Sequence, residues 1–171
     1  AQCNYLAEVA EQYKYGRNNG LKYRVIRRAA HNNDAEVASL ISTLATEPDF
    51  DPTQKSLAFE FLCLNHTLLS YIAALGAHRE KIEDQEVLTL LDLAVENIQG
   101  SLLKDEVPDL NAQNMLDTIR QRLSSNNKDD QKALIVLQQL SLMLSILNQL
   151  SRLKQSLSHD RDDKATELAS L

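Results

Sequence analysis

Five side chains that could bind a ligand together lie in the most apolar long stretch of this chain, FEFLCLNHTLLSYIAALGAHRE at residues 59 to 80. Asn65 and His66 occupy its centre, Tyr71 follows, and His78 and Arg79 close it. A histidine can act as an acid or base or bind a metal, and an arginine can hold a carboxylate through paired hydrogen bonds. Such residues could form a polar pocket for a small ligand between helices. They could equally be hydrogen-bonded to one another, because buried polar groups need partners whether or not they have a function.

The histidine spacing argues against a metal site. His66 and His78 are twelve residues apart, so they lie about 120° apart around a helix. His31 and His159 fall in no recognisable ligand pattern. The sequence contains no H-E-x-x-H motif, no nucleophile elbow and no cysteine–histidine pair with catalytic spacing. We therefore expect no metal, no cofactor and no catalytic residue. The residues of the candidate ligand pocket are Arg27, His31, Asn65, His66, Tyr71, His78 and Arg79.

Positive charge is concentrated at the start of the chain. Residues 1 to 31 carry a net charge of +4 and the remaining residues −10, within a total of −6. Arg24, Arg27, Arg28 and His31 recur at i, i+3, i+4 and i+7, close to one face of a helix. We define the basic stripe as Arg17, Lys22, Arg24, Arg27 and Arg28.

Three roles for the basic stripe are open. It could be solvated or paired with acidic residues such as Glu83, Asp84 and Glu86. Arg27 and Arg28 point about 100° apart on a helix, so one of them could form a buried ion pair with the helix near residues 84 to 103. The stripe could also contact anionic lipid head groups. Nucleic acid is not expected as a partner, because the domain is acidic and has no interleaved aromatic residues.

The run from Leu57 to Ala77 contains 21 residues, enough to cross a bilayer. Glu60 lies inside it, however, and an acidic residue at the bilayer centre costs about 2.5 kcal/mol or more. A later apolar run is interrupted by Gln138, Gln139, Asn148 and Gln149. We interpret both runs as core helices of a soluble bundle. The small residues of the first run would then form a seam for a closely packed helix: Ser70, Ala73, Ala74, Gly76 and Ala77.

Composition and periodicity predict an all-α fold. Four glycines, three prolines and only 5% aromatic residues favour helix over strand. We predict a single bundle of six helices, with the third and sixth at the centre, over residues 2–15, 21–46, 53–82, 84–103, about 111–123 and 130–158. Thr53 is the predicted N-cap of the third helix, and Asp109 or Asn111 that of the fifth. The bundle domain covers residues 1–158, and residues 159–171 form a polar tail that we expect to fray.

The ends and the cysteines suggest an intracellular piece of a longer protein. The chain starts within a helical pattern, with no methionine and no signal peptide, so we expect an excised segment. Cys3 and Cys63 form no disulfide framework, which favours reduced thiols in the cytosol.

Two sequence blocks resemble a known family. YRVIRRAAHNNDAEVASLISTLATEP at residues 23–48 and FEFLCLNHTLLSYIAALGAHRE at residues 59–80 are similar to the YccS-type branch of the fusaric-acid-resistance (FUSC) proteins. The resemblance covers roughly residues 5 to 82. That family consists of bacterial inner-membrane proteins with transmembrane blocks and soluble cytoplasmic segments, many of them assigned to efflux.

The resemblance implies a cytoplasmic domain at the inner membrane, with the basic stripe close to the bilayer. Its expected partners are the transmembrane part of the same protein, anionic lipid head groups and a second copy of the chain. The expected role is assembly, stability or regulation of an efflux transporter, without enzymatic activity. The alternative is a small-molecule sensor or enzyme with a polar pocket around His66.

Overall fold

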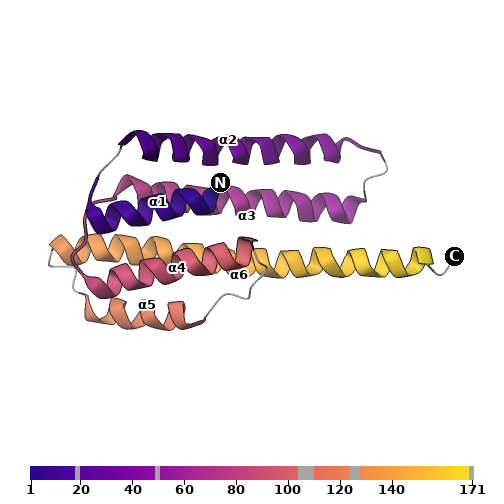
Figure 1. Cartoon of the computed structure of the whole chain (residues 1–171). Helices are drawn as coiled ribbons and strands as arrows, with labels where there is room; N and C mark the ends of the chain where they lie inside the picture. The colour runs from indigo at the N-terminus through magenta and orange to yellow at the C-terminus, as the bar shows by residue number, and fades with distance from the viewer. Residues whose placement is uncertain (18–19, 49–50, 104–109, 124–127, 170–171) are drawn as a thin grey trace.

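The computed structural model describes residues 1–17, 20–48, 51–103, 110–123 and 128–169, with side chains described up to residue 153 except at 110, 128 and 129. Within these residues it contains helices and no strand, which confirms the all-α prediction (Figure 1). The helices are α1 (Gln2–Tyr15), α2 (Gly20–Ala45), α3 (Pro52–Ala77), α4 (Gln85–Leu103), α5 (Leu110–Arg122) and α6 (Lys128–Ala169).

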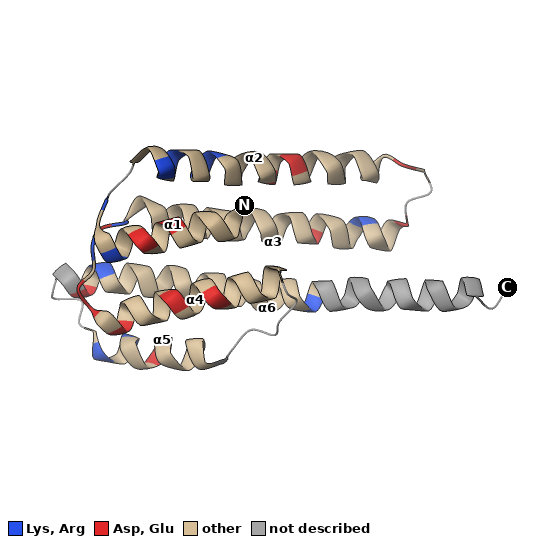
Figure 2. Ribbon diagram, in the orientation of Figure 1, with Lys and Arg blue, Asp and Glu red and all other residues tan. Residues whose placement is uncertain are grey.

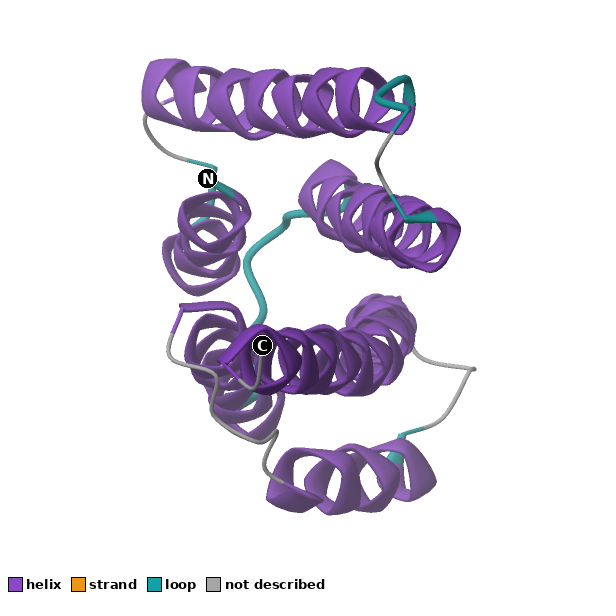
Figure 3. Cartoon of the chain, turned by 90° about the vertical axis from the view of Figure 1, so that its right-hand side faces the viewer, coloured by secondary structure: helices purple, strands orange, loops and turns teal. Residues whose placement is uncertain are grey.

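The helices are stacked in layers. Figures 1 and 3 show α2 on the outside, α1 and α3 beneath it, α4 and α6 beneath those, and α5 on the opposite outer side. α3 contacts α1, α2 and α6, whereas α6 contacts α3, α4 and α5. The predicted central position of the third and sixth helices is therefore confirmed.

The core forms where the apolar stripes of these helices meet. In α4 the side chains of Val87, Leu90, Leu91, Ala94 and Ile98 are buried, as their three-and-four spacing predicted. In α6 the predicted positions Val136, Leu140, Met143, Leu147 and Leu150 are buried as well. The side chain of Leu157, predicted to extend this row, lies outside the described residues.

Some helix boundaries differ from the prediction. Asp51, not Thr53, is the N-cap of α3, and its carboxylate accepts a hydrogen bond of 3.1 Å from the Thr53 amide. α3 ends at Ala77 rather than at residue 82, and the Ile82 amide instead donates to the Tyr13 carbonyl at 3.0 Å. α6 continues to Ala169, past the predicted end at residue 158. The division into a bundle and a polar tail stays a prediction, since the side chains after Leu153 lie outside the described residues.

Two described helices, Pro52–Ala77 and Asp130–Leu153, are long and apolar enough to span a membrane by length and composition alone. In Asp130–Leu153, half of the most apolar stretch is buried, as in a core helix. In Pro52–Ala77, only 17% of the most apolar stretch is buried. The fully buried residues of α3 begin at Leu64, so its first half contributes less to the core than its composition suggested.

Candidate functional site

Three tyrosines surround the C-terminal end of α3. The Tyr5 and Tyr23 hydroxyls lie 3.0 Å apart, the Tyr13 hydroxyl donates to the Leu75 carbonyl at 2.8 Å, and the Tyr23 hydroxyl lies 3.5 Å from the Gly76 carbonyl. The last turn of a helix leaves carbonyls without intrahelical partners, and these hydroxyls supply donors for two of them. Burial raises the pKa of both Tyr5 and Tyr13, which keeps both phenols protonated.

Arg79 joins this cluster from the connection after α3. Its guanidinium carbon lies 3.7 Å from the centre of the Tyr23 ring, a cation–π arrangement. Its Nε donates to Gln12 Oε1 at 2.8 Å, and Gln12 Nε2 donates to the buried Glu8 at 3.0 Å. Glu8 also forms an ion pair with Lys22 of α2. The polar groups beneath the first half of α2 thus form one connected network, in which Arg79 is a structural member.

Asn65 and His66 bind the same carboxylate. Asn65 Nδ2 donates to Asp34 Oδ1 at 2.8 Å, and His66 Nδ1 lies 2.7 Å from Asp34 Oδ2. Asp34 is buried on α2, whereas the His66 side chain is 67% exposed. The pair therefore ties α2 to α3 at the protein surface.

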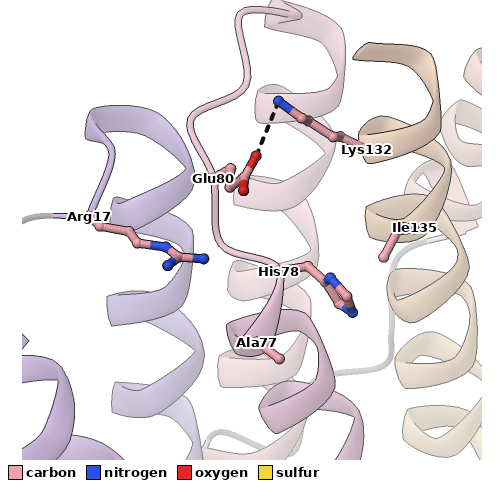
Figure 4. A pocket seen from close by; sticks show the side chains of 6 residues that line it. All are labelled: Arg17, Ala77, His78, Glu80, Lys132 and Ile135. Atoms are coloured by element: carbon pink, nitrogen blue, oxygen red, sulfur yellow. Dashed lines mark ion pairs between the residues drawn. The ribbon is translucent and has the colours of Figure 1, made fainter. Parts of the chain in front are cut away.

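A pocket of about 220 Å³ lies beside the end of α3 (Figure 4). Arg17, His78, Glu80 and Lys132 contribute polar groups, and Ala77 and Ile135 apolar ones. Glu80 and Lys132 form an ion pair of 3.1 Å. Of the predicted pocket residues, only His78 lines this pocket, and Arg17 of the basic stripe lies opposite it.

The other predicted pocket residues do not line this pocket. Tyr71 is half-buried against the core. His31 is exposed with its ring centre 6.5 Å from that of Tyr5, and Arg27 is exposed. The structure thus distributes the predicted pocket over the Asp34 pair, the tyrosine cluster and the pocket at His78. Whether any of them binds a ligand stays a prediction.

Sequence reasoning missed the partners that give these residues their roles. Asp34, Gln12 and the three tyrosines were not singled out, because their contacts join residues from 18 to 67 positions apart. One usable signal was Gly76, since a glycine within a helix indicates close approach by a neighbour. A Cβ at Gly76 would lie 2.7 Å from the Tyr23 hydroxyl oxygen. The close approach expected of the small-residue seam is therefore observed at Gly76, whereas Ser70 and Ala77 of that seam are exposed.

The basic stripe occupies the connection after α1 and the first half of α2 (Figure 2). Lys22 is turned toward Glu8, and Arg17 Nε donates to the Arg79 carbonyl at 3.2 Å. Arg24 Nε donates to the Gly20 carbonyl of its own helix. Arg27 and Arg28 are exposed and form no ion pair with another described residue, so the expected buried ion pair with α4 is wrong.

The acidic residues considered as partners of the stripe pair elsewhere. Asp84 Oδ2 lies 2.8 Å from Arg122 Nη2, Glu86 binds the same nitrogen at 3.0 Å, and Glu83 pairs with Lys81. Burial raises the pKa of Asp84, but hydrogen bonds from Arg122 and the backbone outweigh it, so that the pKa is lowered overall. The same contact raises the pKa of Arg122.

Metal ligands were also sought by geometry. Among the side chains that the structure describes, no group of three or more His, Cys, Asp or Glu residues could hold a metal ion.

Comparison with known proteins gives two relatives. No protein-family model and no solved structure matches the chain. The chain is 40% identical over 159 residues to the inner membrane protein YccS of Escherichia coli K12, an alignment that covers 92% of this chain and 22% of YccS. It is 38% identical over 80 residues to an uncharacterized protein of Haemophilus influenzae, covering 47% of this chain and 11% of that protein. The chain thus spans about a fifth of one relative and a tenth of the other. Along nearly its whole length the chain is thus similar to one segment of YccS, which supports a YccS-like family.

Proposed function

We propose that this chain is a cytoplasmic domain of a bacterial inner-membrane protein, and that it serves the assembly, stability or regulation of a membrane-embedded FUSC-type exporter without catalysing a reaction. The observation that carries the proposal is the similarity to a segment of YccS over 92% of the chain. The relative is an inner membrane protein, so a membrane-associated role follows most directly.

The contacts of the polar side chains support a structural role. Asn65 and His66 bind Asp34 across the α2–α3 interface, and Arg79 binds Gln12 and stacks on Tyr23. Residues that looked suited to chemistry in the sequence thus hold helices together. Such a bundle can transmit or fix the arrangement of a membrane-embedded part.

The cytoplasmic side is supported by the charge distribution. Positively charged residues next to membrane segments are enriched on the cytoplasmic side, and the first 31 residues carry a net charge of +4. The two cysteines, neither of them in a disulfide, suit a reducing compartment.

The pocket beside His78 favours a second candidate function, a small-molecule sensor. Arg17 provides positive charge there, Lys132 is paired with Glu80, and Ile135 forms an apolar wall. A small carboxylate is the ligand class that such a lining fits best.

A thermal-shift screen separates the two candidates. Purified chain is heated with a panel of aromatic carboxylic acids and with divalent metal ions. A ligand present at about 100 times its Kd stabilises a protein by about 2.7 kcal/mol, so binding raises the Tm by several degrees. The proposed function predicts no change in Tm. A reproducible shift that is lost in His66→Ala or His78→Ala, but kept in the control Arg120→Ala at an exposed residue of α5, would establish the sensor instead.

A further inference from the structure

The outer face of α2 combines exposed apolar side chains with arginines that form no ion pair with another described residue. Leu21 and Val25 are 65% and 59% exposed, although both are large hydrophobic residues. Positions i, i+3, i+4 and i+7 of the helix are Leu21, Arg24, Val25 and Arg28, so the four side chains share one face. We call these four residues the α2 outer face.

This face points away from the rest of the bundle. Tyr23 and Ala30, on the opposite side of the same helix, are buried against α1 and α3. α2 is itself the outermost layer, as Figures 1 and 3 show. The helix can therefore lie flat on a surface without disturbing the core.

The charge of this part of α2 indicates what kind of surface the α2 outer face would contact. Residues 20 to 33 contain four basic residues and no acidic one. Lys22 is directed toward Glu8, and Arg27 lies on the side of the buried Tyr23, which leaves Arg24 and Arg28 on the outer face. Arginines beside exposed aliphatic side chains suit a bilayer interface, where the guanidinium groups bind phosphates and the apolar side chains enter between head groups.

We propose that the α2 outer face docks on an anionic phospholipid surface, with Arg24 and Arg28 on lipid phosphates and Leu21 and Val25 in the head-group region. This inference rests on the proposed function, since it names the surface by which a cytoplasmic domain meets its membrane. The inference assigns lipid contacts to only part of the basic stripe, because Arg17 and Lys22 form contacts within the protein.

The absence of tryptophan from the chain gives a clean spectroscopic test. Val25→Trp places a single fluorophore on the proposed face, and Leu103→Trp, at a 71% exposed residue of α4, is the matched control. Both proteins are mixed with phosphatidylcholine vesicles that do or do not contain phosphatidylglycerol. To offset weak affinity, a second series tethers each protein through a terminal histidine tag to vesicles that carry nickel-chelating lipid.

With anionic vesicles, the emission of Val25→Trp should shift to the blue and that of Leu103→Trp should not. Each basic residue near such a surface contributes a factor of about five in binding. Arg28→Glu should therefore weaken co-sedimentation at least fivefold, and salt should weaken it as well. The control Arg120→Glu, at an exposed residue of α5, should have a smaller effect, and circular dichroism should show unchanged helix content in every variant.

Three results would overturn the inference. They are no blue shift of Val25→Trp even when tethered, equal shifts at both positions, and equal weakening by Arg28→Glu and Arg120→Glu. A blue shift that grows with protein concentration in the absence of vesicles would assign the face to a second copy of the chain. None of these results decides on which side of a membrane the domain lies, so failure here is distinguishable from failure of the proposed function.

Discussion

Gly76 is the residue at which one added methyl group would most disturb the junction of α1, α2 and α3. A Cβ there would lie 2.7 Å from the Tyr23 hydroxyl, 3.1 Å from the Tyr5 hydroxyl and 3.2 Å from Val9 Cγ2. Gly76→Ala should lower the free energy of unfolding by about 1–3 kcal/mol, the usual cost of overpacking. Urea denaturation followed by circular dichroism measures this.

A double-mutant cycle identifies the cause. Tyr23→Phe removes the hydroxyl that the new methyl group would meet. In that background, the destabilisation by Gly76→Ala should be smaller by about 0.5 kcal/mol or more. Gly20→Ala, at a glycine with open space around its Cα, is the control and should cost little. Equal costs of Gly76→Ala in both backgrounds would show that Tyr23 is not the obstacle.

Asp84 gives a prediction on pH. Its pKa is lowered in the folded state, so it contributes stability above its unfolded pKa, near 3.9, and loses it as pH falls through the lower folded pKa. Asp84→Asn keeps a side-chain oxygen that can accept from the Glu86 and Val87 amides but removes the charge. It should cost about 0.2–1 kcal/mol at neutral pH, since the ion pair is screened by solvent.

The cost of Asp84→Asn should vanish at low pH, below the folded pKa of Asp84. Chemical denaturation at several pH values measures it, with Asp117→Asn as the matched exposed control. A cost that does not change with pH would mean that the charge of Asp84 contributes nothing.

The sequence identified the polar residues of α3, but neither their exposure nor their partners could be predicted from it. His66 was the focus of the expected pocket, yet it is largely exposed and bound to Asp34, 32 residues earlier. Lys22 was expected in the basic stripe, but Glu8 lies beneath it. Partner choice depends on how helices are stacked, and hydrophobic periodicity holds no information on that.

Among the helices, α2 buries few of its side chains. Only Tyr23, Ala30, Asp34 and Ile41 are buried among its 26 residues. Asp34→Ala would leave Asn65 without its acceptor, at a cost of about 1–3 kcal/mol. We therefore expect faster amide hydrogen exchange in α2, with much less change in α4.

Hydrogen exchange read by mass spectrometry tests this expectation, with Glu36→Ala, at an exposed residue of α2, as the control. Uniformly faster exchange in all helices would contradict a local role for Asp34. So would unchanged protection in α2.

Helix positions were predicted well where the apolar period of 3.6 and the loop residues agree. The start of α4 and the span of α1 match, but α3 was drawn five residues too long. Ile82 continued the apolar pattern, whereas it is buried after the helix has ended and its amide bonds to Tyr13 of α1. Tertiary packing, not helix periodicity, accounts for that hydrophobic residue.

At the scale of the whole molecule, the predicted all-α bundle with α3 and α6 at its centre is observed. The layer order was not predictable, because several helices have comparable apolar faces. α2 contacts α1 and α3 and lies on the outside of the bundle. The basic residues near the start of the sequence are therefore exposed on an outer helix (Figure 2).

The central claim is that this chain lies on the cytoplasmic side of the inner membrane, and thiol labelling tests it most directly. Cys63 is exposed, whereas Cys3 is buried and its pKa is raised by burial, so Cys63 should react selectively. Intact cells that produce the natural protein are treated with a membrane-impermeant or a membrane-permeant maleimide, and Cys63→Ser identifies the relevant signal. Cells with a permeabilised outer membrane ensure that the impermeant reagent reaches the periplasm. If the domain is cytoplasmic, the permeant reagent alone should label the protein in the membrane fraction. Labelling of Cys63 by the impermeant reagent in those cells, or recovery of the protein only in the soluble fraction, would contradict it.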